Sequence, residues 1–200
     1  MAETTRPPEW AEALLWLSLK AADRENVSGD LLEEYRASIV PTRGKSAADR
    51  WYVRQVSGFV WRTTWLWALV FSGPFIARTA YDWLVPTTDF HLRAQLSTDL
   101  GVATLLLIGL WAGWRARSFA AGVAIAVVVS QIAAIISVIG GGLLFALLAT
   151  PDVRRAIDGS GGLGEVFGMP FMMIIPALIV GSAGSGVASL GRKVRSSFVG

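Results

Sequence analysis

The sequence predicts an all-α polytopic membrane protein with four transmembrane helices and a small N-terminal helical module on the cytoplasmic side. Hydrophobic residues make up 53% of the chain and charged residues only 16%, whereas a soluble domain has about 25% charged residues. Long apolar stretches dominate the chain after a charged N-terminal segment. The predicted domains are therefore residues 1–50, the cytoplasmic module, and residues 51–200, the transmembrane domain.

The module is expected to contain two short helices ahead of the first span. A first helix is predicted over residues 9–21, because two prolines just before it favour a helix start. Its predicted apolar face has side chains at i, i+4 and i+7: Trp10, Leu14 and Leu17. The second helix has an apolar ladder at four-residue spacing: Val27, Leu31, Tyr35 and Ile39. Its other side is charged, which indicates an amphipathic helix that ends in a turn at residues 41–44.

A third helix is predicted to start at residues 46–49 and to run into the first span. Ser46 and Asp49 fit a capping box in which aspartate takes the usual place of glutamate. Four side chains just ahead of the span have the chemistry of an interface anchor: Arg50, Trp51, Tyr52 and Arg54. Aromatic rings of this kind favour the headgroup region, and arginine attracts anionic phosphates. We therefore predict that these four side chains face the lipid bilayer.

Three short motifs in this region occur in order along the chain: Asp23-Arg24-Glu25, then Gly29-Asp30-Leu31 with Glu33-Glu34-Tyr35, then Arg50-Trp51-Tyr52-x-Arg54-Gln55. Together they resemble the bacterial permease prefix domain over residues 8–60. In that family the module precedes the first transmembrane helix of large permeases of macrolide-exporter-like ABC transporters. The chain departs from those permeases in having only three further short spans, so the exporter role of the family is not carried over to it.

The four predicted spans cover residues 56–77, 96–114, 118–142 and 166–187. Each is long enough to cross a hydrocarbon core of about 30 Å at 1.5 Å per residue. The third apolar stretch continues to residue 149, which is too long for one untilted crossing and too short for two. We expect one span with a break or bend at the glycine triplet 140–142, because glycine weakens a helix. Two separate segments are the alternative.

Cationic residues predict the orientation of the chain. Thirteen arginines and lysines fall on the side that holds both termini, and four fall on the other side: Arg78, Arg93, Arg154 and Arg155. The positive-inside rule therefore predicts a multi-pass protein of the bacterial inner membrane with both termini in the cytoplasm. Cationic residues that face anionic lipid also account for the basic composition, so no nucleic-acid partner is expected.

No constellation of catalytic, cofactor-binding or metal-binding residues emerges from the sequence. The chain has no cysteine and a single histidine, His91, so thiol chemistry and a histidine metal triad are excluded. The acidic residues Asp30, Glu33 and Glu34 are typical of a solvated helix face. Residues 159–164 match G-x-G-x-x-G by letter but follow no predicted strand. An enzyme that uses His91 at the outer surface is the least favoured hypothesis.

The spans contain residues suited to close helix packing: Gln131, Gly181, Gly184 and Gly186. Small side chains let helix backbones approach in lipid, and packing within one bundle is favoured over assembly with another chain. The leading hypothesis is a non-enzymatic accessory or regulatory membrane component with a docking head, linked to an ABC-type permease system or to self-association. The alternative is a small oligomeric transporter or channel, although no span interior holds the acidic residue that ion-coupled carriers use.

Overall fold

The chain is all-helical over the residues that the structure, a computed structural model, describes: all except 1–5, 85–89, 153, 155–167, 169–170 and 200. The helices follow in the order α1 (Glu9–Ser18), α2 (Arg24–Glu34), the π-helix η1 (Tyr35–Ile39), α3 (Val40–Arg43), α4 (Lys45–Leu84), α5 (Phe90–Arg115), α6 (Phe119–Leu148) and α9 (Ile174–Val199). The described residues contain no strand. The predicted all-α class is therefore confirmed.

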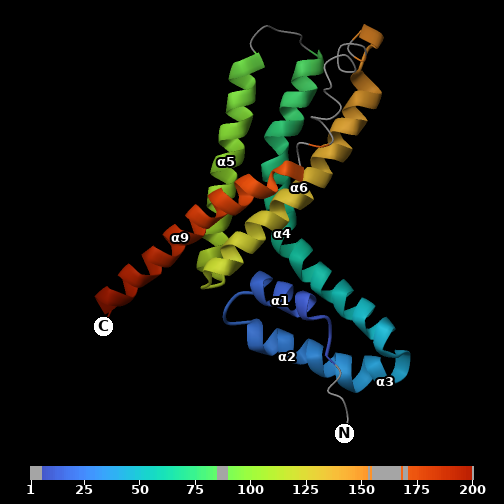
Figure 1. Ribbon diagram of the computed structural model, residues 1–200, viewed down its shortest axis with the longest axis vertical. Helices are drawn as coiled ribbons and strands as arrows, with labels where there is room; N and C mark the ends of the chain where they lie inside the picture. The colour runs from blue at the N-terminus through green and yellow to red at the C-terminus, as the bar shows by residue number, and fades with distance from the viewer. Residues whose placement is uncertain (1–5, 85–89, 153, 155–167, 169–170, 200) are drawn as a thin grey trace.

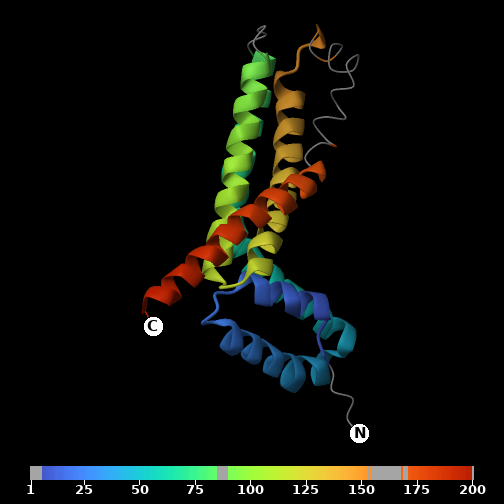
Figure 2. The same ribbon diagram turned by 60° about the vertical axis from the view of Figure 1, so that its left-hand side comes forward.

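The helices form two parts that α4 joins (Figure 1). The head consists of α1, α2, η1, α3 and the first turns of α4. The bundle consists of the rest of α4 with α5 and α6 alongside it, and α9 crosses this group obliquely, as Figure 2 also shows. The most extensive helix contacts are those of α9 with α5 and of α4 with α6. The head, the turn between α5 and α6, and the C-terminus lie toward the same end of the bundle (Figures 1 and 2).

Three described helices are long and apolar enough to cross a membrane, over Gln95–Arg115, Phe119–Leu148 and Ile174–Ser197. They correspond to the predicted second, third and fourth spans. The predicted first span, 56–77, lies inside α4, which is not among the three. Its apolar content is diluted by polar side chains and a proline: Arg62, Thr63, Thr64, Ser72 and Pro74.

Two span boundaries differ from the prediction. Helix α6 runs without a break through the glycine triplet 140–142, and Gly140 lies close to α4. A Cβ atom at Gly140 would lie 3.0 Å from a methyl carbon of Ile76 on α4. Helix α9 continues past the predicted end at residue 187 as far as Val199, so the cationic C-terminal residues belong to the helix.

The buried face of α1 is shifted by one residue from the predicted one. Helix α1 ends at Ser18 and buries side chains at i, i+4 and i+7: Ala11, Leu15 and Ser18. The predicted face is therefore wrong as the core face, and Trp10 is 61% exposed. The reason is a matter of size: Ala11 and Ser18 are small enough for α1 to lie close to its neighbours, and Trp10 is not.

The predicted ladder of the second helix is confirmed, since Leu31, Tyr35 and Ile39 are buried. Four-residue spacing drifts around an ideal α-helix of 3.6 residues per turn, and the wider π-helical turn at η1 offsets that drift. The predicted turn at 41–44 is helical as far as Arg43. The chain turns at Gly44, whose φ of 75° favours glycine.

Candidate functional site

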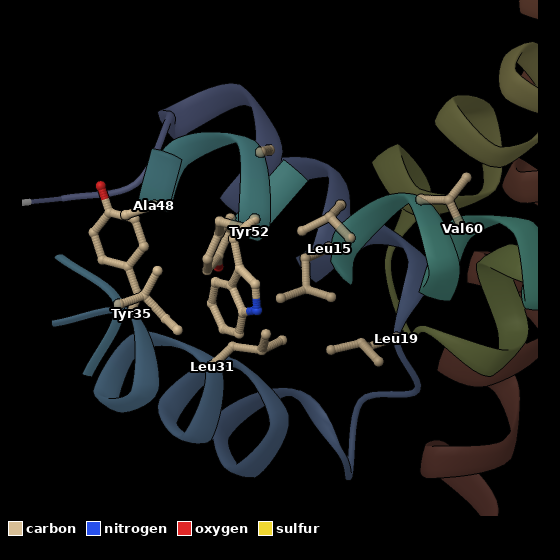
Figure 3. Packing of buried hydrophobic residues seen from close by; sticks show 11 residues of the cluster. Leu15, Leu19, Leu31, Tyr35, Ala48, Tyr52 and Val60 are labelled. Atoms are coloured by element: carbon tan, nitrogen blue, oxygen red, sulfur yellow. The ribbon is translucent and has the colours of Figure 1, made fainter. Parts of the chain in front are cut away.

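The head has its own apolar core, in which Leu15, Leu31, Tyr35, Trp51 and Tyr52 pack together (Figure 3). The rings of Tyr35 and Tyr52 meet edge to face, with 5.8 Å between their centroids. Aromatic pairs of this geometry contribute about 0.5–1.5 kcal/mol beyond the burial of their surface. The core therefore ties the start of α4 to all the other helical elements of the head.

Trp51 and Tyr52 lie in this core and not at a surface. Trp51 is 8% exposed and Tyr52 0%, so these two of the four expected anchor residues do not offer their rings to lipid. The physical reason is that a small three-helix module needs large side chains to close its core. The other two, Arg50 and Arg54, are exposed, and Arg50 donates a hydrogen bond from Nη1 to Ser46 Oγ at 3.1 Å.

A polar cluster at the edge of the head core joins three side chains. Tyr35 donates its hydroxyl proton to Asp49 Oδ1 at 2.5 Å, and Lys45 Nζ lies 2.7 Å from both Asp49 carboxylate oxygens. The carbonyl oxygen of Arg6 lies 3.2 Å from the same hydroxyl. The Asp49 carboxylate thus binds Tyr35 and Lys45. The predicted capping box is wrong because α4 begins at Lys45, which places Ser46 inside the first turn and not at the N-cap.

The contacts within this cluster shift the pKa values of its three side chains. Burial alone would raise the pKa of Asp49, but the hydrogen bonds from Lys45 and Tyr35 outweigh it and hold that pKa below its ordinary 3.8. Burial, and then the hydrogen bond to Asp49, raise the pKa of Tyr35. The hydrogen bond to Asp49 raises the pKa of Lys45. The folded head therefore favours a charged Asp49 and a neutral Tyr35.

Acid is expected to loosen the head through Asp49. Because the folded pKa is lowered, Asp49 stabilises the head above the unfolded pKa, and this contribution is lost as the pH falls through the folded pKa. Protease sensitivity of the head in the detergent-solubilised chain should therefore rise below the ordinary pKa of 3.8. Asp49→Asn should be less stable at neutral pH and should show a smaller acid effect. An unchanged acid profile in this variant would contradict the assignment.

The hydroxyl of Tyr52 is buried and has no hydrogen-bond partner among the described residues. Burial, followed by the negative charge of Glu12, raises the pKa of Tyr52 to about 12. A buried hydroxyl without a partner costs about 1–3 kcal/mol. The ring of Tyr52 thus stabilises the head core by packing, while its buried hydroxyl destabilises it.

Tyr52→Phe is therefore expected to keep or raise the stability of the head, by up to about 1–3 kcal/mol. Tyr35→Phe is the matched control, because it removes the bond to Asp49 and should lower stability by about 1.5–3 kcal/mol, as for bonds to charged groups. Both can be measured by urea-dependent proteolysis of the full chain in detergent. Equal losses in the two variants would show that the Tyr52 hydroxyl is satisfied in solution.

The C-terminal end of α1 packs on the bundle. Residues of four helices meet in one contact region: Leu17, Ser18, Leu19, Thr63, Trp111, Ala112, Arg115, Ala116 and Ile125. The Arg115 guanidinium lies over the Trp111 ring, 5.1 Å from its centroid. Its Nε is buried and makes no hydrogen bond to the described residues. We name this region the head–bundle junction.

The predicted packing glycines of the fourth span behave differently from one another. A Cβ atom at Gly184 would overlap the backbone oxygen of Leu106 and lie 2.9 Å from the backbone nitrogen of Leu110. At Gly181 it would lie 2.6 Å from Ala126 Cβ. At Gly186 it would meet nothing within 4 Å. Gly181 and Gly184 thus allow α9 to approach α6 and α5, while Gly186 faces open space.

Hydrogen bonds add to the packing of α9. Ser185 Oγ donates to the Phe119 carbonyl oxygen at 2.8 Å. Arg192 donates from Nη1 to the Gly113 carbonyl oxygen at 2.6 Å. The sequence interpretation missed Arg192 as a packing residue, although a basic side chain that donates to a carbonyl in the last turn of a helix is a known pattern. The hydrogen bond of Gln131, in contrast, goes to Ser130 of its own helix at 3.4 Å.

Within the described part of the chain, the remaining candidate features form no assembled site. Asp30, Glu33 and Glu34 are exposed on α2. Among the described residues, no group of three or more histidine, cysteine or acidic side chains could hold a metal ion. The side chain of His91 and the glycine-rich segment 159–164 lie outside what the structure describes.

A scan against protein-family models, a search of curated proteins and a search of solved structures find no match to this chain. The resemblance to the permease prefix domain therefore rests on the three motifs alone. Functional interpretation depends on the head, the head–bundle junction and the bundle itself.

Proposed function

We propose that the chain is a non-enzymatic accessory component of the bacterial inner membrane, with four transmembrane helices and a cytoplasmic head that docks a partner. The observation that carries this proposal is the head–bundle junction. The α1 end of the head packs on α4 and α6, and side chains of α5 line the same junction. A partner bound to the head would therefore be coupled to the bundle through packed side chains and not through a loose linker.

Support for a fourth span comes from the exposed face of α4. Its outward side chains between residues 66 and 70 are large and apolar: Leu66, Leu69 and Val70. The hydroxyls of Thr64 and Ser72 are buried and donate to carbonyl oxygens of their own helix, those of Val60 and Leu69. An apolar outer face with internally satisfied polar groups is what a helix in hydrocarbon requires.

The docking surface in this proposal is the exposed charged side of α2, which includes Asp30, Glu33 and Glu34. The core side of α2 is occupied by the head itself, because Leu31 is buried there. A charged, solvated face suits a transient interaction with a complementary cationic surface. The resemblance to permease prefix domains favours a subunit of an ABC-type permease system as the partner.

Site-specific photo-crosslinking in native membranes tests both parts of the proposal. A crosslinker at Glu33 should capture a membrane permease subunit, identified by mass spectrometry, whereas a crosslinker at the exposed Leu107 on α5 should capture lipid. Capture of only further copies of this chain from position 33 would instead favour the oligomeric transporter or channel. No capture of protein from position 33 would refute the docking role. Reporter fusions at Gly200 and within 87–92 should report opposite sides of the membrane.

A further inference from the structure

Four exposed tryptophans on three different helices lie within two residues of side chains that line the head–bundle junction. They are between 42% and 53% exposed: Trp16 on α1, Trp61 and Trp65 on α4, and Trp114 on α5. An indole ring that is half exposed to water gives up part of its favourable burial. A set of such rings gathered in one region therefore indicates a surface that is covered by something other than water.

The junction shows that these tryptophans share one position along the long axis of the bundle, which we call the junction level. Leu17, Thr63 and Arg115 all belong to the junction. Trp16 and Trp114 are adjacent in sequence to two of them, and Trp61 and Trp65 lie two residues to either side of Thr63. At 1.5 Å per residue along a helix, each ring is attached within about 3 Å of the junction level. That level coincides with Arg115, the end of the candidate span Gln95–Arg115.

Cationic side chains accompany the rings. The guanidinium of Arg24 lies over the Trp16 ring, 4.9 Å from its centroid, and its Nε donates to the Trp16 carbonyl oxygen at 2.9 Å. Arg62 follows Trp61 directly and is exposed, and Arg117 is exposed in the turn after α5. Indoles with adjacent arginines match the headgroup layer of a bilayer with anionic lipid, where the ring has an apolar side and the cation finds phosphate.

We propose that these four tryptophans form one interfacial belt, and that Trp16 with Arg24 holds the α1 end of the head within the anionic headgroup layer. The inference rests on the membrane-spanning arrangement proposed above. It assigns the lipid contact of the head to α1, on residues that differ from Trp51 and Tyr52, which the head core occupies. The head is then attached to the membrane surface at its α1 end while α2 faces the cytoplasm.

The absence of cysteine from the chain allows a direct test, since single cysteines can carry a nitroxide spin label. Three labelled variants of the full chain are reconstituted in vesicles of phosphatidylcholine and phosphatidylglycerol: Ala13→Cys, Glu33→Cys and Leu107→Cys. Ala13 is exposed on α1 one turn before Trp16, Glu33 is exposed on α2, and Leu107 is exposed within the α5 span. Collisions with a water-soluble nickel chelate and with lipid-soluble oxygen report the depth of each label.

The label at position 13 should be several-fold less accessible to the nickel chelate than the label at position 33, and more accessible to oxygen. Adding Trp16→Ala and Arg24→Ala to the Ala13→Cys chain should bring its accessibility close to that of position 33. If positions 13 and 33 were equally accessible in the chain without further substitutions, and position 107 lay in hydrocarbon, the proposed belt would be refuted. The membrane-spanning proposal would then still stand. An aqueous environment at position 107 as well would refute the membrane-spanning proposal.

Discussion

Gly184→Leu is expected to cost about 3 kcal/mol or more of bundle stability, because overpacking reaches or exceeds this value where the obstacle cannot move. The first side-chain carbon would already overlap the Leu106 carbonyl oxygen, which belongs to the backbone of α5. A backbone atom inside a helix cannot rotate away as a side chain can, so α9 would have to separate from α5. Thermal unfolding of the purified protein in detergent should show a large decrease in midpoint.

Gly186→Leu is the matched control, two residues along the same helix. A Cβ atom at Gly186 meets nothing within 4 Å, so this variant should unfold near the temperature of the unaltered chain. If Gly186→Leu kept its stability but lost an oligomer on a native gel, the open side of α9 would be an assembly face. If Gly184→Leu unfolded normally, the close approach of α9 and α5 would be wrong.

Trp51→Ala is expected to destabilise the head by about 3–5 kcal/mol, the usual cost of truncating a buried aromatic side chain. Trp51 packs with Leu15 and Leu31 in the head core and is the largest side chain of that cluster. Loss of that much stability approaches the whole stability that so small a core can supply. Limited proteolysis should therefore cut the variant chain rapidly within α1 and α2 while the bundle remains intact.

Trp10→Ala separates this effect from a general loss of tryptophan. Trp10 is on α1 but largely exposed, so its removal should leave the protease resistance of the head nearly unchanged. Similar cleavage of the two variants would mean that Trp51 is not part of a closed core. In that case the interface-anchor interpretation of Trp51 would regain its basis.

Periodicity predicted those parts of the fold that depend on the local sequence. The ladder Leu31, Tyr35 and Ile39 is buried as predicted, because a regular spacing of large apolar side chains on one helix has a single way to face a core. The long apolar stretches likewise became long helices. Helix ends were predicted less well, as at α9, because polar residues continue a helix as readily as they end one.

The missed features depend on contacts between distant segments. Trp51 and Tyr52 have the composition of an interface anchor, and only the position of α1 and α2 reveals that they fill a core. The hydrogen bond that Tyr35 donates to Asp49 likewise cannot be found from a motif of four consecutive residues. Gly184 and Gly186 look alike in sequence, yet one touches backbone and the other touches nothing. Which side of a helix is buried depends on the helices that pack against it.

Helix α4 is one uninterrupted helix of 40 residues that begins in the head and ends at the far side of the bundle. The head is attached to the bundle twice, once through α4 and once through the contact of α1 at the junction. Two points of attachment restrain the head from rotating relative to the bundle, which a single connection would not do. A partner bound to α2 would therefore be held at a fixed distance and orientation relative to the bundle.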